Sequence, residues 1–237
     1  MEREISILMI TAASIGFVHT ILGPDHYIPF IVMAKARNWS LFKTSWITIL
    51  CGLGHVGSSV VFGIIGIAAG IGISKIEGWE SFRGGLAAWA FIIFGFIYFL
   101  WGMWRALKKK PHSHLHVHKN GSTHRHDHNH TEAHDHYHGR EKVTKMTPWI
   151  LFLIFVLGPC EPLIPILMYP AAQNSTGGLI LVTIVFALIT IVTMLIVVLI
   201  FSFGITKLPF GKLERYTHAI AGGIIFLSGV GIQFLNL

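Results

Sequence analysis

The stretch Leu22-Gly23-Pro24-Asp25-His26 interrupts an apolar segment that is long enough to span a lipid bilayer, and Leu157-Gly158-Pro159-Cys160-Glu161 does the same later in the chain. Each stretch places a helix-breaking Gly-Pro pair directly before side chains that ligate metals. Ionisable groups inside a membrane are costly and by default mark a functional site. Two corresponding breaks of this kind are typical of transporters, whose binding site lies between two repeats.

The composition indicates a membrane protein. Of the 237 residues, 53% are hydrophobic and 12% are charged, whereas an average soluble domain has about 25% charged residues. The net charge of +7 comes mainly from three loops, so it does not indicate a nucleic-acid partner. Cys51 and Cys160 both fall within apolar runs and therefore give no disulfide framework. Apolar runs of about 20 residues set the number of spans, and we count six: 5–33, 44–73, 84–106, 148–169, 178–203 and 216–236.

The basic residues alternate between successive loops. Lysine and arginine are frequent in the loops after the first, third and fifth spans, whereas the opposite side has only Arg3, Lys75 and Arg83. The positive-inside rule therefore predicts a multi-pass protein of the plasma (inner) membrane with both termini outside and the three basic loops in the cytoplasm.

The two interrupted segments also resemble each other beyond the break. Residues 26–33 and 161–168 share their apolar pattern once one inserted residue is allowed, and three spans separate the two breaks. We therefore predict an all-α membrane protein with six transmembrane helices, arranged as a 3+3 inverted repeat in which helices 1 and 4 are broken. The predicted parts are a first repeat (1–107), a cytoplasmic disordered loop (108–147) and a second repeat (148–237).

The breaks predict a shared metal site. Proline is favoured at the first position of a helix, so Pro24 and Pro159 should begin the second half of each broken span. His19 lies two turns before His26 on one helix face, and His55 lies in a glycine-rich stretch that allows close helix packing. Imidazole and carboxylate ligands suit nickel, cobalt or zinc. The predicted ligands are His19, Asp25, His26, His55, Cys160 and Glu161.

Eleven of the fifteen histidines fall within residues 112–138, between the third and fourth spans. The segment is polar and lacks an apolar pattern, which predicts disorder. Histidine-rich tracts bind zinc, nickel, cobalt or copper, so this loop should gather metal ions. Its histidines are His112, His114, His116, His118, His124, His126, His128, His130, His134, His136 and His138.

His19, Asp25-His26 and Gly54-His55, together with the histidine-rich loop, resemble the nickel/cobalt permease and efflux families. The broader likeness is to the membrane family of urease-accessory nickel permeases and lysine-exporter-like proteins. This resemblance covers the six-span layout and implies transport of divalent nickel or cobalt by His19, Asp25, His26 and His55. Five residues rather than the usual four separate His19 from Asp25.

The segment Gly158-Pro159-Cys160-Glu161-Pro162 resembles a different class, the transmembrane thiol-disulfide electron carriers used in cytochrome maturation. Those carriers need one proline-flanked cysteine in each half. In this chain Asp25 stands where the partner cysteine would be, and Cys51 lies in another motif. We therefore interpret the likeness as shared architecture in which metal ligation replaces redox chemistry.

The leading hypothesis from the sequence is a transporter, not an enzyme. Its substrate would be a divalent metal ion, nickel or cobalt first and zinc next, with no prosthetic group. Protons would be the coupling ion because imidazoles titrate near neutral pH. Efflux is favoured over uptake. The alternatives are nickel uptake, a thiol-disulfide electron carrier, a membrane-anchored metal sensor or chaperone, and an exporter of anions or small organic molecules.

Overall fold

A computed structural model describes residues 2–108, 112–117, 123–128, 146–173, 175–208 and 211–235. Within these residues, five helices are long and apolar enough to cross a membrane, which confirms a helical, multi-pass membrane protein in contact with lipid. They are α1 (Glu2–Leu22), α3 (Leu41–Ala68), α4 (Ile73–Leu107), α7 (Thr176–Lys207) and α8 (Thr217–Leu235). The antiparallel strands β1 (His112–Val117) and β2 (Thr123–His128) lie in the segment for which we predicted disorder.

Both helix breaks are present. The first separates α1 from α2 (Ile28–Ala36), with the short 3-10 turn η1 (Pro24–His26) between them. The second separates α5 (Met146–Leu157) from α6 (Leu163–Ala172). Neither α5 nor α6 is long enough to cross a membrane alone, so the span predicted at 148–169 is not among the five.

The positions of the prolines differ from the prediction. Pro24 opens only the 3-10 turn, and Pro159 is followed by an irregular turn, so neither begins an α-helix. The reason is a second proline in each segment: Pro29 lies in the first turn of α2, and Pro162 is the N-cap of α6. A proline is tolerated at a helix start but not further inside, so these later prolines set where the α-helices begin.

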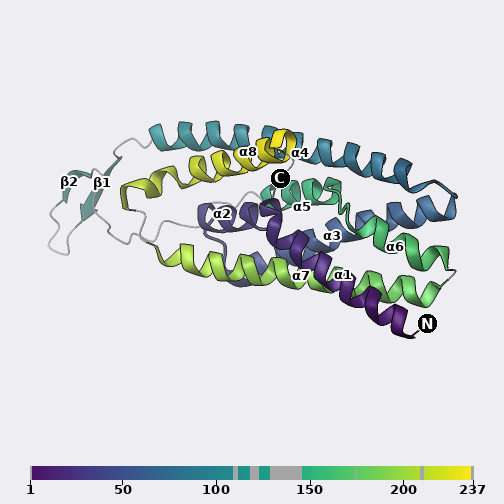
Figure 1. Cartoon of the computed structure of the whole chain (residues 1–237). Helices are drawn as coiled ribbons and strands as arrows, with labels where there is room; N and C mark the ends of the chain where they lie inside the picture. The colour runs from purple at the N-terminus through teal and green to yellow at the C-terminus, as the bar shows by residue number, and fades with distance from the viewer. Residues whose placement is uncertain are drawn as a thin grey trace.

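The helices form an elongated bundle in which α4 lies along α8 and α1 packs against α7 (Figure 1). Two buried apolar clusters lie on either side of the breaks. One surrounds α2 and includes Phe30, Met33 and Phe155. The other surrounds α6 and includes Leu163 and Phe186. Each half-helix that follows a break is therefore held by its own core.

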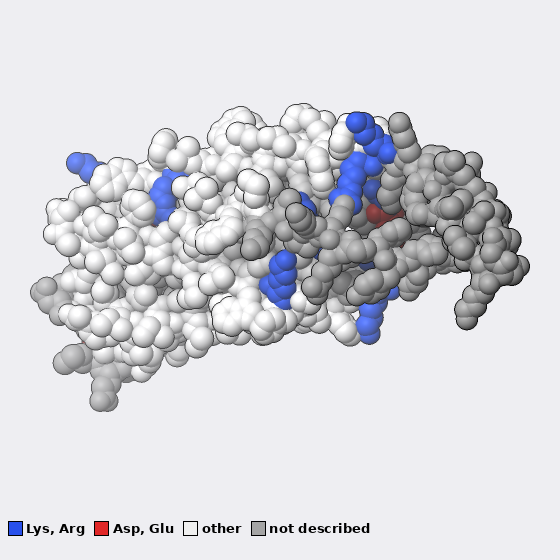
Figure 2. All heavy atoms as spheres, turned by 180° about the vertical axis from the view of Figure 1, so that it is seen from behind, with Lys and Arg blue, Asp and Glu red and all other residues white. Residues whose placement is uncertain are grey.

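The outer surface is apolar over much of its area. Figure 2 shows a face that is mostly uncharged, with a few scattered lysine and arginine side chains and several more together toward one end. Large apolar side chains such as Phe82 on α4 and Ile10 on α1 are more than two-thirds exposed, as expected where helices face lipid. Arg83 is not a loop residue, contrary to the sequence analysis: it lies within α4 and is buried.

The contact between α4 and α8 depends on glycine. A Cβ atom on Gly95 of α4 would overlap the backbone of Phe226, and one on Gly222 of α8 would overlap the backbone of Phe99. Small residues allow helix backbones to approach closely in lipid, where dispersion contacts replace the hydrophobic effect as the main attraction. The two helices therefore meet backbone to backbone.

This contact gives a first prediction. We expect Gly222→Ala to destabilise the protein by about 1–3 kcal/mol, because the added methyl group overpacks a rigid backbone contact. The neighbouring Gly223→Ala is the control, since its Cβ would meet only the Phe99 ring at an ordinary 3.6 Å. Thermal unfolding of the detergent-solubilised variants measures both, and equal melting temperatures would contradict the close approach of the two helices.

Candidate functional site

A cavity of about 760 Å³ lies at the first break, between α1, η1, α3, α4, the end of α5 and the end of α8. Five of the six predicted ligands line it, and Cys160 does not. Its remaining wall is largely apolar and includes Phe91, Ile154 and Phe155. The predicted ligands that line the cavity are His19, Asp25, His26, His55 and Glu161.

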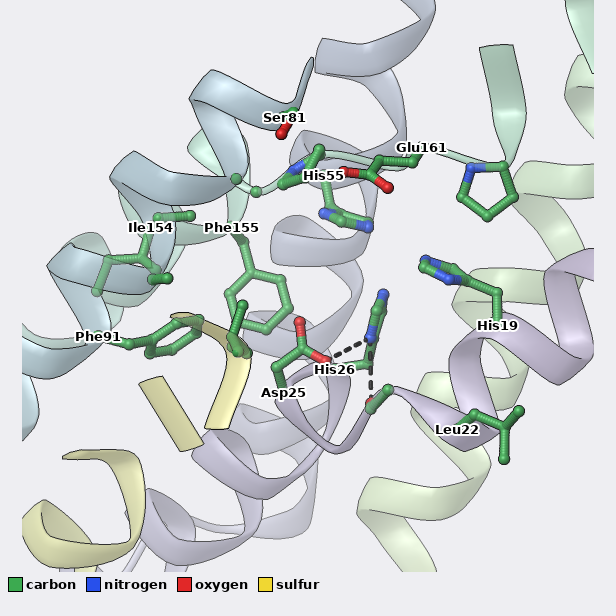
Figure 3. Close-up of a pocket in the computed structure, with 18 of the residues that line it drawn as sticks. His19, Leu22, Asp25, His26, His55, Ser81, Phe91, Ile154, Phe155 and Glu161 are labelled. Carbon is green, nitrogen blue, oxygen red and sulfur yellow. Dashed lines mark hydrogen bonds and ion pairs between the residues drawn. The ribbon is translucent and has the colours of Figure 1, made fainter. Parts of the chain in front are cut away.

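Three imidazoles converge in this cavity (Figure 3). His19, His26 and His55 each present a nitrogen that lies within 4.8 Å of the other two, and the ring of His26 is 4.7 Å and 5.0 Å from the rings of His19 and His55. The Nε2 atoms of all three are buried without a hydrogen-bond partner among the described residues. A tetrahedral metal site holds its nitrogens about 3.4 Å apart, given bonds of about 2.05 Å, so a small closure of the rings brings them to ligation distance.

The first break fixes the orientation of His26. Its Nδ1 atom lies 3.1 Å from the carbonyl oxygen of Gly23 and 3.1 Å from Oδ1 of Asp25. Both partners are acceptors, so Nδ1 carries the proton and Nε2 keeps the lone pair that faces the other imidazoles. A Cβ on Gly23 would lie 2.5 Å from Nδ1, so the approach requires glycine.

The second break does the same for His55. The backbone carbonyl of Phe155, near the end of α5, lies beside the His55 imidazole, where it can act as a hydrogen-bond acceptor: its oxygen and Nδ1 of His55 would each lie 3.3 Å from a Cβ on Gly158. Because Nε2 has no partner, such a bond uses Nδ1. Each break thus supplies a carbonyl that orients one imidazole and a glycine that makes room for it.

Two carboxylates complete the cavity. Asp25 is a quarter exposed beside His26, and Glu161 reaches the cavity from the second break, near His55 (Figure 3). A dication in a low-dielectric site is costly unless opposite charges balance it. Asp25 and Glu161 supply that balance from the cavity wall, whereas the group of close ligand atoms consists of the three imidazoles alone.

The two cysteines lie elsewhere. Cys160 and Cys51 are fully buried in different apolar clusters. The backbone N–H of Cys160 donates to Oγ of Ser59 over 2.9 Å, eight residues beyond Cys51 on α3 and therefore about 12 Å along the helix axis. Both thiols are free, and neither cysteine belongs to the imidazole cluster or lines its cavity.

Sequence reasoning missed one buried pair of charges. Glu80 and Arg83 form an ion pair inside α4, and both side chains are buried beside the second break. Opposite charges three residues apart on one helix face were the available signal. The structure does not describe the side chains of the histidines in the 112–138 loop. Their role in gathering metal therefore stays a prediction.

Fold and site together define a membrane protein in which two helix breaks surround a buried cluster of imidazoles. Residues 28–231 match the family described as cytochrome C biogenesis protein transmembrane region. The chain therefore belongs to this family. No curated protein and no solved structure matches the chain.

This match corrects two of our interpretations. The assignment to the nickel/cobalt permease and efflux families is wrong, and so is the function of nickel or cobalt transport that followed from it, because the family is one of thiol-disulfide electron carriers. The permease resemblance rested on a few histidines and one aspartate, which other metal-binding proteins also use. The resemblance of the Gly-Pro-Cys segment to electron carriers agrees better with the match.

The site geometry gives a second prediction. To separate this site from the loop, we use the full chain with the eleven loop histidines replaced by glutamine, called the loop variant below. In it, we expect Gly158→Ala to weaken Co²⁺ binding about tenfold, because the methyl group displaces an imidazole from its carbonyl partner. Visible absorption of bound Co²⁺ measures the affinity. Gly57→Ala is the control, since its Cβ would meet no atom within 4 Å; equal affinities would contradict the orienting role of the second break.

Proposed function

We propose that this chain transfers electrons across the membrane in which it lies, with a metal ion held by His19, His26 and His55 as its redox centre. The observation that carries the proposal is the group of three buried Nε2 atoms without partners, which face one another across a few ångströms. Buried polar atoms are nearly always satisfied, so three unsatisfied ones at one place indicate a missing ligand.

The family supports the electron-transfer part of the proposal. Its members are thiol-disulfide electron carriers, and such a carrier needs two sulfurs that can bond. A disulfide requires Cα atoms about 4.4–6.8 Å apart, whereas Cys51 and Cys160 lie in separate clusters. In this chain the imidazole site takes the place of the cysteine pair.

The chemistry of the ligands narrows the choice of metal ion. Imidazole suits zinc, copper, iron and nickel, but zinc has no redox chemistry. We therefore propose copper or iron, which accept and release one electron at a time. A dithiol that becomes a disulfide releases two electrons and two protons, so a one-electron centre would have to pass the first electron to an acceptor across the membrane before it could take the second.

The topology proposed for this function has six spans. The helix pair α5 and α6 with its break would form the fourth of these spans, as α1, η1 and α2 form the first, and the two halves would be an inverted repeat. The site then lies near the membrane midplane. The charge pattern supports a plasma-membrane orientation with both termini outside and residues 108–147 in the cytoplasm.

The third prediction tests metal and electron flow together. We expect the loop variant to bind one Cu²⁺ per chain and, in liposomes that enclose ferricyanide, to reduce it when ascorbate is added outside. His55→Ala in the same background should lose the copper and slow ferricyanide reduction at least tenfold, because two imidazoles hold the ion less tightly. Metal analysis and ferricyanide absorbance are the measurements.

His218→Gln is the matched control, because His218 bonds Tyr98 at a distance from the cavity and is not one of its lining residues. It should behave as the loop variant does. Copper binding without electron flow would leave a metal site but exclude the redox role. Undiminished electron flow in His55→Ala would exclude the imidazole centre.

The family match also favours a second candidate, a carrier that uses Cys51 and Cys160 as a reversible disulfide pair. The fourth prediction separates the two. If the imidazole site carries the electrons, Cys51→Ser and Cys160→Ser should each retain at least half of the wild-type rate in the liposome assay. Loss of activity in both variants, together with oxidative cross-linking of the two sulfurs in the wild-type chain, would establish the cysteine route instead.

A further inference from the structure

The pair Glu80 and Arg83 places two charges inside the membrane-spanning helix α4, seven and ten residues after it begins. Glu80 is completely buried and Arg83 is 7% exposed. Charges at such depth are expensive and by default serve a function. A buried ion pair is also weak evidence for stability, since well-packed neutral residues often serve as well. The reason for this pair therefore has to be sought in what it touches.

The hydrogen bonds of the pair end on the backbone of the second break. Nη2 of Arg83 donates to the carbonyl oxygen of Val156 over 2.9 Å and to Oγ of Ser58 over 2.7 Å. Oγ of Ser59 donates to Oε2 of Glu80 over 2.9 Å and accepts the backbone N–H of Cys160 over 2.9 Å. The network thus holds one carbonyl before the break and one N–H after it.

These two backbone groups need such partners because α5 ends inside the bundle. The last four carbonyls of a helix have no partner within it. Gly158 N–H bonds the carbonyl of Ile154 over 2.9 Å, and Arg83 bonds that of Val156. The carbonyl between them, that of Phe155, is the one that faces the His55 imidazole across Gly158. Any shift of Val156 therefore also moves the group that orients this imidazole.

A direct contact fixes the same place. A Cβ on Gly84, the residue after Arg83, would lie 2.9 Å from Cγ of Pro159, so α4 touches the break itself. Ser58 adds a third link, because its Oγ donates to the carbonyl oxygen of His55 over 2.9 Å while it accepts from Arg83. The pair is thus connected to His55 through α3 as well as through the break.

We infer that Glu80 and Arg83 are positioning residues of the imidazole site, which hold the second break where it orients His55. The inference rests on the proposed function for the site's ligand, but the placement of His55 can be measured without metal. It assigns to α4, which contributes no imidazole, control over the geometry of the site.

The fifth prediction uses a neutral replacement of the pair. In the loop variant, Glu80→Gln with Arg83→Met removes both charges at nearly constant volume, so the protein should fold and melt close to the parent. The carbonyl of Val156 then lacks its guanidinium. We expect Cu²⁺ affinity to fall about 10- to 100-fold, as for other partners that orient ligands. The electron paramagnetic resonance spectrum of bound Cu²⁺ should also change.

A second readout needs no metal. In the metal-free protein, the ¹⁵N signals of His55, assigned by their absence in His55→Gln, should move in the double variant. Glu77→Gln, an exposed carboxylate on the same helix, is the matched control and should change neither signal nor affinity. The variant Arg83→Lys should have a Cu²⁺ affinity between those of the parent and the double variant. Its ammonium still reaches one acceptor but lacks the planar fork of a guanidinium.

The outcomes separate the two proposals. Unchanged His55 signals and unchanged Cu²⁺ affinity in a folded double variant would overturn the positioning role and leave the proposed function standing. If the His55 signals shift in the double variant but the parent loop variant itself binds no Cu²⁺, the positioning role is supported and the metal centre is overturned. Shifts in both readouts, with Glu77→Gln silent, support both.

Discussion

A helix that ends inside a membrane leaves carbonyl and N–H groups that no water can satisfy, and this constraint governs the protein. At the first break, the phenolic hydroxyl of Tyr27 donates to the carbonyl oxygen of Ile21 and His26 bonds that of Gly23. At the second break, His55 and Arg83 provide the partners. Two of these side chains, His26 and His55, are also imidazoles of the site, so a change at either break alters a group that the site depends on.

Much of this follows from the sequence because the constraint acts on short segments. A Gly-Pro pair in an apolar run must break a helix, and a ligand residue beside it must be near the freed backbone. His19, Asp25, His26, His55 and Glu161, which the sequence singled out as ligands, all line the cavity, and their role as metal ligands stays a prediction. The meeting of His55 with the other imidazoles depends on how α3 packs against both breaks, and no local pattern in the sequence encodes that packing.

The errors of the sequence analysis have physical causes as well. Arg83 lies near the edge of an apolar run, where a charge is usually solvated, and only its partner Glu80 makes burial tolerable. We predicted that α-helices begin at Pro24 and Pro159, but they begin beside the later prolines, Pro29 and Pro162. The metal-transport interpretation failed because a few histidines and an aspartate indicate that a metal ion can bind, but not what the protein does with that ion. The family match, which covers 204 residues from 28 to 231, constrains the architecture far more strongly.

The glycine contact between α4 and α8 has a mechanical consequence. Helices that meet through long side chains slide past each other by changing rotamers, but two backbones in direct contact have no such freedom. α4 is the last helix before the loop that divides the chain, and α8 lies in the second half. Their backbone contact therefore joins the two halves rigidly. We therefore expect any motion that opens or closes the cavity to occur at the interrupted helices and not between α4 and α8.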